Sequence, residues 1–304
     1  MEYYKLSNGN LMPKIGLGTD DVLFSRRLKK SNNKYIQMAL SIYQQHILRP
    51  YLNNKLSLSI EDAIRDGYYL IDTSASYANE ASIGKAIKHS GIKREKFFLT
   101  SRVTNKQQYA RQVRQSFFAS LKNLNVDYLD LYMFHWPVTD YYLETWVEME
   151  KLYEEGYVKN LGFANCHQHH IKSILDICHI RPVVNQVEIH PLFTQKPLIE
   201  FCKKEGIQIE AYSPLAQNND RLRNNRILKQ LADKYGKTIQ QIILRWHIQN
   251  GVVPIPRSTN KKRLRENIDI FDFSLCDQEM SKIDGININS RLRYDPDNCD
   301  FTSL

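Results

Sequence analysis

The sequence predicts an α/β fold, a closed parallel (β/α)8 barrel of the TIM-barrel class, and three observations support this. The chain has 304 residues, a length that suits one barrel. Short apolar, β-branched or aromatic runs recur, separated mostly by stretches of helical periodicity. Each run ends on a polar residue, and strand ends meet at one rim of a barrel. The eight runs span residues 13–19, 68–72, 97–102, 128–135, 160–165, 183–188, 208–213 and 252–257.

The remaining elements can be predicted in order along the chain. Residues 5–13 are expected to form a hairpin at the bottom of the barrel, because Asn8-Gly9 favours a tight turn. Ser59 is predicted to cap a short helix that stops at Gly67. Amphipathic helices are predicted over 80–90, 108–124, 142–155, 169–178, 196–204, 226–235, 238–249 and 260–268, with a terminal helix over 277–283. The chain from Asn287 onward is expected to be an irregular tail.

Residues 20–56 form a long insertion after the first barrel strand. About forty residues between a strand and its helix exceed the usual connection. The insertion carries the basic cluster 26–30 and then a predicted amphipathic segment over 35–48. Because it follows a strand's C-terminal end, it should project from the rim, where it covers the pocket, recruits a protein partner, or is a tolerated surface insertion. We treat residues 1–304 as one domain that contains this insertion.

Composition limits the class of protein. Hydrophobic residues make up 42% and charged residues 25% of the chain, which suits a large packed core. No apolar run approaches the roughly 20 residues needed to span a bilayer, and the polar N-terminus does not resemble a secretion signal. Five unpatterned cysteines without an export signal indicate reduced thiols and a cytoplasmic location. The net charge of +9 favours anionic partners, either nucleic acid or a phosphorylated cofactor or metabolite.

Four residues near the predicted rim suit carbonyl reduction. Asp72, Arg102 and His135 end three successive strands, and Tyr77 follows the first of them by a short loop. A phenol held near a cation and an imidazole can donate a proton to a carbonyl that is being reduced. We expect the cation to lower the tyrosine pKa, Asp72 to hold the cation, and His135 to orient the carbonyl. Taken alone, the tyrosine could serve only packing, and the Asp–Arg pair could be purely structural. The four residues indicate a catalytic site only because they are predicted to share one rim.

Several motifs in one order resemble the aldo-keto reductase superfamily, and together they cover nearly the whole chain outside the insertion. These motifs lie at 67–80, 130–137, 185–191, 211–215 and 255–267. The resemblance implies a barrel that passes hydride from NADPH to an aldehyde or ketone. The chain has no Gly-x-Gly-x-x-Gly fingerprint, and the resemblance does not require one because this family holds its dinucleotide on a barrel.

The resemblance also implies a role for each matching residue. Tyr77 looks like the proton donor, Asp72 like its charge partner, and His135 like the group that orients the carbonyl. The residues matched to the cofactor are Asn165 and Gln186 at the nicotinamide carboxamide, Tyr212 against the nicotinamide ring, Ser213 and Leu215 at the pyrophosphate, Arg257, Ser258 and Arg263 at the adenosine 2′-phosphate, and Glu266 and Asn267 at the adenine, with Thr19 grouped beside them at the first strand end. Two guanidiniums can clamp a phosphate bidentately, which favours NADPH over NADH.

Arg102 departs from the resemblance, because the family places a lysine at this position. An arginine keeps the charge, and a unit charge about 4 Å away is worth roughly 4 kcal/mol at an effective dielectric constant of 20. Its planar fork can instead pair bidentately with Asp72 and turn away from Tyr77. We therefore predict weakened reductase activity that Arg102→Lys should raise.

The predicted substrate pocket is also less apolar than the resemblance implies. Asp20 and Thr104 occupy positions at which the family often has aromatic residues, whereas Trp136 is retained. Ala164 replaces the serine that usually precedes the asparagine at the carboxamide, which removes one hydrogen bond to the nicotinamide. The preferred small-molecule carbonyl substrate therefore cannot be inherited from the family.

Residues 166–170, with the sequence Cys-His-Gln-His-His, contain several types of metal ligand, and Cys178 and His179 follow downstream. Zinc sites prefer two separated ligand pairs with regular spacing. These residues run from a turn into a helix, so their side chains are expected to point in several directions. We therefore predict no metal site.

The leading hypothesis is a cytoplasmic, monomeric reductase of small carbonyl compounds with NADPH as cofactor. The alternative is a pseudoenzyme that keeps nucleotide binding and acts as a regulatory or scaffolding protein, with the insertion as its docking surface. Arg102 and the insertion favour the pseudoenzyme, whereas Tyr77, His135 and Tyr212 favour the enzyme. A third hypothesis, nucleic-acid binding through the basic clusters, lacks a recognised module or an aromatic stacking platform.

Overall fold

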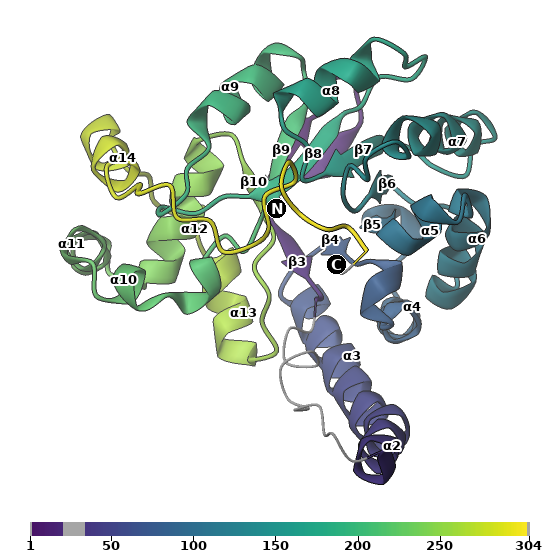
Figure 1. The fold of residues 1–304 in the computed structure, drawn as a ribbon. Coiled ribbons are helices and arrows are strands. Elements are labelled where there is room, and N and C mark those ends of the chain that lie inside the picture. The colour runs from purple at the N-terminus through teal and green to yellow at the C-terminus, as the bar shows by residue number, and fades with distance from the viewer. Residues whose placement is uncertain (1, 21–33, 303–304) are drawn as a thin grey trace.

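The computed structural model describes residues 2–20 and 34–302, in which eight parallel strands form a barrel surrounded by helices (Figure 1). Each strand pairs with its neighbour in chain order. The end strands approach each other where the Gly18 N–H donates to the Pro256 carbonyl (3.2 Å), which nearly closes the barrel. A Cβ on Gly18 would lie 2.8 Å from the Ile255 carbonyl oxygen, so this approach requires glycine. The strands are β3 (Gly16–Gly18), β4 (Leu70–Asp72), β5 (Phe98–Val103), β6 (Leu131–Phe134), β7 (Leu161–Ala164), β8 (Val184–Glu188), β9 (Gln208–Tyr212) and β10 (Val253–Pro254).

The predicted N-terminal hairpin is confirmed and plugs the barrel. Strands β1 (Tyr3–Lys5) and β2 (Leu11–Pro13) pair antiparallel. Leu6 and Met12 are buried in one apolar cluster with residues of the barrel strands, among them Leu70 and Phe98. The burial of these side chains removes apolar surface from water and seals the N-terminal ends of the strands.

The helices follow the predicted order with two corrections. The helix predicted over 108–124 is two helices, because Arg111 takes a left-handed conformation (φ 52°) between them. Ser59 does not cap a helix: it lies inside α3 (Arg49–Arg65), where its hydroxyl donates to the Lys55 carbonyl (2.8 Å). The other helices are α4 (Glu80–His89), α5 (Asn105–Tyr109), α6 (Val113–Leu124), α7 (Tyr142–Glu154), α8 (Gln168–Leu175), α9 (Lys196–Lys204), α10 (Asp220–Arg223), α11 (Arg226–Tyr235), α12 (Ile239–Gln249), α13 (Lys261–Ile268) and α14 (Asp277–Asp284).

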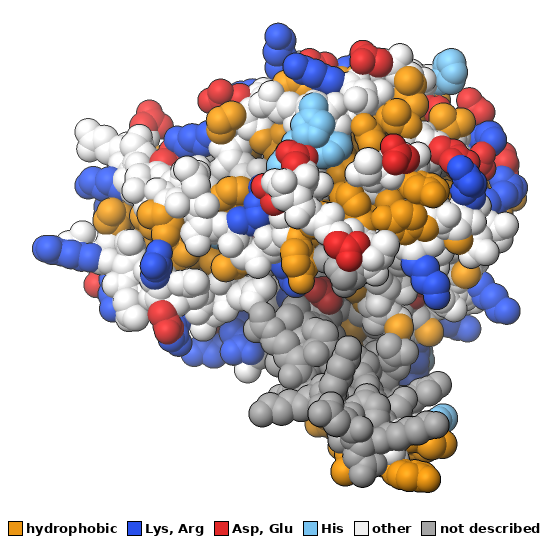
Figure 2. Space-filling model, in the orientation of Figure 1, with side chains coloured by type: hydrophobic (Ala, Val, Ile, Leu, Met, Phe, Trp, Pro, Cys, Tyr) orange, Lys and Arg blue, Asp and Glu red, His pale blue; other side chains and the backbone are white. Residues whose placement is uncertain are grey.

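The described part of the insertion is helical and projects from the barrel as an arm (Figure 1). Helix α2 (Lys34–Tyr43) continues through a π-helical turn (Gln44–Leu48) into α3, so the segment over 35–48 that was predicted to be amphipathic is helical. The arm exposes large apolar side chains, including Met38 and Ile42 (Figure 2). The basic cluster at 26–30 lies outside the described residues.

Two further features of the structure concern membrane-spanning helices and the pairing of the cysteines. None of the described helices has the length and apolar character needed to cross a bilayer. All five cysteines lie within the described residues and are free thiols.

Candidate active site

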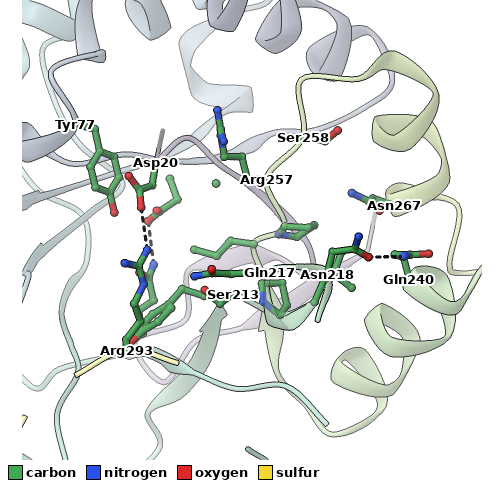
Figure 3. A pocket seen from close by; sticks show the side chains of 18 of the residues that line it. Asp20, Tyr77, Ser213, Gln217, Asn218, Gln240, Arg257, Ser258, Asn267 and Arg293 are labelled. Atoms are coloured by element: carbon green, nitrogen blue, oxygen red, sulfur yellow. Dashed lines mark hydrogen bonds and ion pairs between the residues drawn. The ribbon is translucent and has the colours of Figure 1, made fainter. Parts of the chain in front are cut away.

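One cavity of about 810 Å³ opens at the C-terminal ends of the strands (Figure 3). Asp72, Tyr77, Arg102 and His135 all line it. Asp72 and Arg102 lie on β4 and β5, His135 directly follows β6, and Tyr77 ends a short 3-10 helix after β4. Asp20 and Trp136 line it as well. So do most of the residues matched to the cofactor, namely Asn165, Gln186, Tyr212, Ser213, Leu215, Arg257, Ser258, Arg263, Glu266 and Asn267.

Arg102 is buried at the end of the cavity that Tyr77 and His135 line, and it bonds to three residues there. Its Nη2 atom pairs with Asp72 Oδ1, its Nη1 donates to Gln186 Oε1 (2.6 Å), and its Nε donates to the Thr73 carbonyl (3.2 Å). The guanidinium carbon lies 5.9 Å from the Tyr77 ring centroid. The bidentate pairing predicted with Asp72 is wrong, because the three nitrogens bond to three different residues. The hydrogen bonds of Arg102 nevertheless go to residues of the barrel. Arg102 acts on Tyr77 only through its positive charge, without a hydrogen bond between them.

A second buried carboxyl, Glu210 on β9, belongs to the same network and was not identified from the sequence. Gln186 Nε2 donates to both Asp72 Oδ1 (2.9 Å) and Glu210 Oε2 (2.6 Å). Burial raises the pKa of Glu210 to about 8, and repulsion from Asp72 adds to this. Burial also raises the pKa of Asp72, but the directly bonded Arg102 opposes that effect. We therefore place the proton of this pair on Glu210 at neutral pH and the negative charge on Asp72.

The rings of Tyr77 and His135 stand edge to face, with centroids 6.0 Å apart. Burial raises the pKa of Tyr77, whereas Arg102 lowers it by a smaller amount. The expected lowering by the cation is present, but desolvation of the phenolate outweighs it, so the pKa of Tyr77 is raised overall. Burial and the positive charge of Arg102 lower the pKa of His135 well below its ordinary value. Tyr77 is thus a protonated phenol and His135 a neutral imidazole at neutral pH, and both can donate hydrogen bonds.

Asn165 and Tyr212 both line the cavity and are held by a hydrogen bond between their side chains. The Tyr212 hydroxyl donates to Asn165 Oδ1 (2.8 Å), and Asn165 Nδ2 donates to the His135 carbonyl (2.9 Å). Asn165 has a positive φ (62°), a conformation that asparagine adopts more readily than most residues. These bonds fix a polar amide and an aromatic ring side by side next to His135.

The far end of the cavity is lined by the start of α13. Ser258 is buried, and its hydroxyl accepts from the Asn260 N–H (3.1 Å) just before the helix begins. Asn260 caps the helix by accepting from the Arg263 N–H (3.0 Å). Figure 3 shows Ser258 and Asn267 at the end of the cavity opposite to Tyr77. A helix start with nearby guanidiniums suits a phosphate group.

The C-terminal tail supplies a wall of the cavity that the sequence did not predict. Arg293 and Tyr294 line the cavity, and Arg293 Nη2 lies 3.5 Å from Asp20 Oδ2 across it (Figure 3). Glu188 anchors this tail, since its two oxygens accept from the backbone N–H groups of residues 292 (2.6 Å) and 293 (2.8 Å). Nothing in the periodicity of the tail could have signalled this, because the tail is irregular.

Two predicted site residues do not line the cavity. Thr19 is buried, and its hydroxyl donates to the Asp72 carbonyl (2.8 Å), so it supports the strand end instead. Thr104 caps α5 by accepting from the Gln107 N–H (3.4 Å). Further lining residues that the sequence did not indicate are Gly18, Pro214, Gln217, Asn218, Gln240, Ile255 and Pro256.

The histidine cluster after β7 has an arrangement that differs from the one expected. Instead of pointing in several directions, His167, His169 and His170 all approach the carboxylate of Asp297 in the tail. Cys166 is buried and lies outside this group. Periodicity along one helix could not reveal the convergence, because Asp297 lies far away in the sequence.

Comparison with known proteins identifies the family to which this architecture belongs. The model of the aldo/keto reductase family matches residues 53–288. A glyoxal reductase of Bacillus subtilis is 46% identical over 244 residues, which are 80% of this chain and 88% of the relative. A methylglyoxal reductase of Escherichia coli is 37% identical over 295 residues, 96% of each chain. The crystal structure of a Bombyx mori aldo-keto reductase in complex with NADP superposes with a TM-score of 0.82 at 32% identity, covering 97% of this chain and 96% of that one.

Proposed function

We propose that this chain, which belongs to the aldo/keto reductase family, uses NADPH to reduce small polar aldehydes and ketones, 1,2-dicarbonyl compounds among them. The observation that carries the proposal is the placement of Tyr77 and His135. Both hydrogen-bond donors line the same cavity as Asn165, Gln186 and Tyr212. The cavity thus has a catalytic end and, continuous with it, a surface suited to a dinucleotide.

The residues of the cavity fit NADPH. Asn165 supplies an amide group for a carboxamide, and the ring of Tyr212 supplies a flat surface for the nicotinamide. Both N–H groups of Gln186 are bonded to Asp72 and Glu210, so Gln186 offers only its amide oxygen. At the other end, Arg257 and Arg263 supply positive charge beside the start of α13, where a 2′-phosphate would be held. The glyoxal and methylglyoxal reductases and the NADP-bound neighbour support this assignment.

NADPH, when bound, supplies the hydride for the carbonyl carbon. Tyr77 then donates its phenolic proton to the carbonyl oxygen, because its raised pKa keeps it protonated at neutral pH. His135, neutral at this pH, donates a hydrogen bond that holds the same oxygen in place. Arg102 stabilises the resulting phenolate by its charge, and Asp72 keeps the guanidinium fixed.

The Arg102 network supports weakened activity relative to a lysine at this position. All three guanidinium nitrogens bond to Asp72, Gln186 and Thr73, so none is committed to the tyrosine hydroxyl. The charge still acts on Tyr77 across 5.9 Å, but without a directed hydrogen bond.

The mouth of the cavity supports a small polar substrate. Asp20 and Arg293 form an ion pair there with partly exposed side chains. A 1,2-dicarbonyl presents a second carbonyl oxygen next to the reacting one, and Arg293 is placed to donate a hydrogen bond to it. A long apolar substrate would instead have to desolvate this pair without replacing its hydrogen bonds.

The test is an assay of the full chain with methylglyoxal, glyoxal, a long-chain aldehyde and a quinone, followed by NADPH absorbance. We expect turnover of the two dicarbonyls with NADPH and weaker turnover with NADH. Arg263→Ala should reduce the preference for NADPH without changing kcat for the saturated enzyme. NADPH binding, measured by tryptophan fluorescence, without turnover of any substrate would favour the nucleotide-binding pseudoenzyme. A preference for NADH would refute the phosphate assignment.

A further inference from the structure

Three histidines and two aspartates from distant segments meet at the surface beside the cavity. His167, His169 and His170 lie at the start of α8, whereas Asp295 and Asp297 lie in the C-terminal tail. Figure 2 shows histidine side chains gathered beside acidic ones on this face. One ring nitrogen of His169, one of His170 and one carboxylate oxygen of Asp297 all lie within 4.8 Å of one another. The same holds for His167, Asp295 and Asp297.

The spacing of these atoms is close to that of a coordination shell. His169 Nε2 and His170 Nε2 lie 3.2 Å and 3.6 Å from Asp297 Oδ1, and His167 Nδ1 lies 2.8 Å from Oδ2. Two ligands bound at about 2.0–2.1 Å to one tetrahedral ion are separated by about 3.3–3.4 Å. Only small side-chain rotations would therefore bring the imidazoles of His169 and His170 and the Asp297 carboxylate onto one centre.

We propose that this cluster, the tail clamp, binds one divalent first-row transition metal ion, zinc in particular. His169, His170 and Asp297 are the ligands, and His167 holds the other oxygen of the Asp297 carboxylate. Imidazole and carboxylate ligands suit zinc, nickel, cobalt and copper, whereas calcium and magnesium prefer shells made only of oxygen. The proposal does not depend on reductase activity, because none of these residues takes part in carbonyl reduction.

Binding has an identifiable cost within the cluster. His170 Nδ1 accepts a hydrogen bond from the His167 backbone N–H (3.2 Å), so the proton of the neutral ring lies on Nε2. Coordination through Nε2 moves that proton to Nδ1, and the ring must turn away from the backbone N–H. One hydrogen bond is thus exchanged for a metal–nitrogen bond, and the neutral imidazole loses no proton to solvent.

A metal ion here would connect the tail to the barrel. Arg293 and Tyr294, which precede Asp297 in the chain, line the cavity. Phe301, which follows Asp297, packs near Trp136, with the two ring centroids 6.4 Å apart. His167 is two residues from Asn165 at the end of β7. An ion held between α8 and Asp297 therefore fixes the segment of the tail that borders the active site.

The test uses the full chain without a polyhistidine tag, because a tag would supply competing imidazoles. We expect calorimetry with Zn²⁺ to show one site per chain, and Co²⁺ to give the visible absorption of a tetrahedral centre. Asp297→Asn and His169→Ala should each weaken zinc binding by more than about tenfold. The matched controls are His179→Ala, an exposed histidine beyond the same helix, and Cys276→Ser, an exposed thiol, and both should bind as the parent does.

A second measurement uses the parent chain alone and so does not depend on the folding of variants. Zinc should slow proteolysis within the tail, and magnesium at the same concentration should not. The proposal is overturned if no stoichiometric site is found, if the Co²⁺ spectrum shows thiolate ligation, or if affinity survives both Asp297→Asn and His169→Ala.

Discussion

Two regions border the same cavity, and different interactions hold them. At the catalytic end, Asp72 and Arg102 form a buried ion pair, with side chains 3% and 2% exposed. In the tail, Arg293 pairs with Asp20 through side chains that are 34% and 43% exposed. Removal of one partner from a buried pair typically costs about 3–5 kcal/mol, whereas an exposed pair is worth about 0–1 kcal/mol. The catalytic end is therefore rigidly specified, and the tail is the part that substitutions or ligands can adjust.

The largest effect should come from the catalytic end. Tyr77→Phe removes the proposed proton donor but keeps the ring that packs against His135, so kcat should fall by about 10²–10⁴-fold. Steady-state assays with methylglyoxal measure this loss. NADPH affinity, followed by tryptophan fluorescence, should stay within about twofold because Tyr77 is not among the groups placed at the cofactor. A variant with nearly full activity would show that another group donates the proton.

Arg102→Met should produce the largest change in stability. It leaves Asp72 buried without its cation beside Glu210, so the free energy of unfolding should fall by about 3–5 kcal/mol. Denaturant titration measures this change.

Arg102→Lys keeps the charge but replaces the planar guanidinium with a flexible amine, so kcat should rise by up to about tenfold, equivalent to 1.4 kcal/mol. An unchanged or lower kcat for Arg102→Lys would contradict our account of the weakened reductase.

Glu210→Gln tests whether the network holds a proton at neutral pH. The folded-state pKa of about 8 exceeds the ordinary value of 4.5, so the folded protein binds more protons than the unfolded chain between these values. Stability of the parent should therefore fall as pH rises from 4.5 to 8, by at most about 1.4 kcal/mol per pH unit from this group. The variant should lack this contribution. Parallel pH profiles of unfolding for the two proteins would show that Glu210 is ionised in the fold.

The smallest effect should come from the tail. Arg293→Leu removes one partly exposed hydrogen-bond donor at the mouth of the cavity, so KM for methylglyoxal should rise by about two- to fivefold while kcat stays similar. Arg291→Leu is the matched control, since Arg291 does not line the cavity and stacks on Phe193 instead. If the two variants change KM equally, the effect belongs to the tail as a whole and not to the guanidinium of Arg293.

Much of the fold could be predicted because hydrophobic periodicity is local. The strand ends at Asp72, Arg102 and His135 were placed by their own short runs, and barrel closure then brought them to one cavity. Errors arose where a local signal was overridden. Ser59 resembled a helix cap, yet the helix continues through it, and the Ser59 hydroxyl donates to the Lys55 carbonyl of the preceding turn instead of capping a helix. Apolar spacing predicted one continuous helix over 108–124, but the left-handed backbone of Arg111 divides it into two helices.

The sequence by itself determined the barrel, its rim and the residue types available for chemistry, because side-chain periodicity and strand order follow from neighbouring residues. Only the tertiary structure decided how these residues are paired. Arg102 bonds to Gln186, Gln186 donates to the Glu210 carboxyl, and Asp297 meets the histidines of α8 across more than a hundred residues. Such pairings depend on burial and on distances between segments remote in the chain, and no local pattern encodes them.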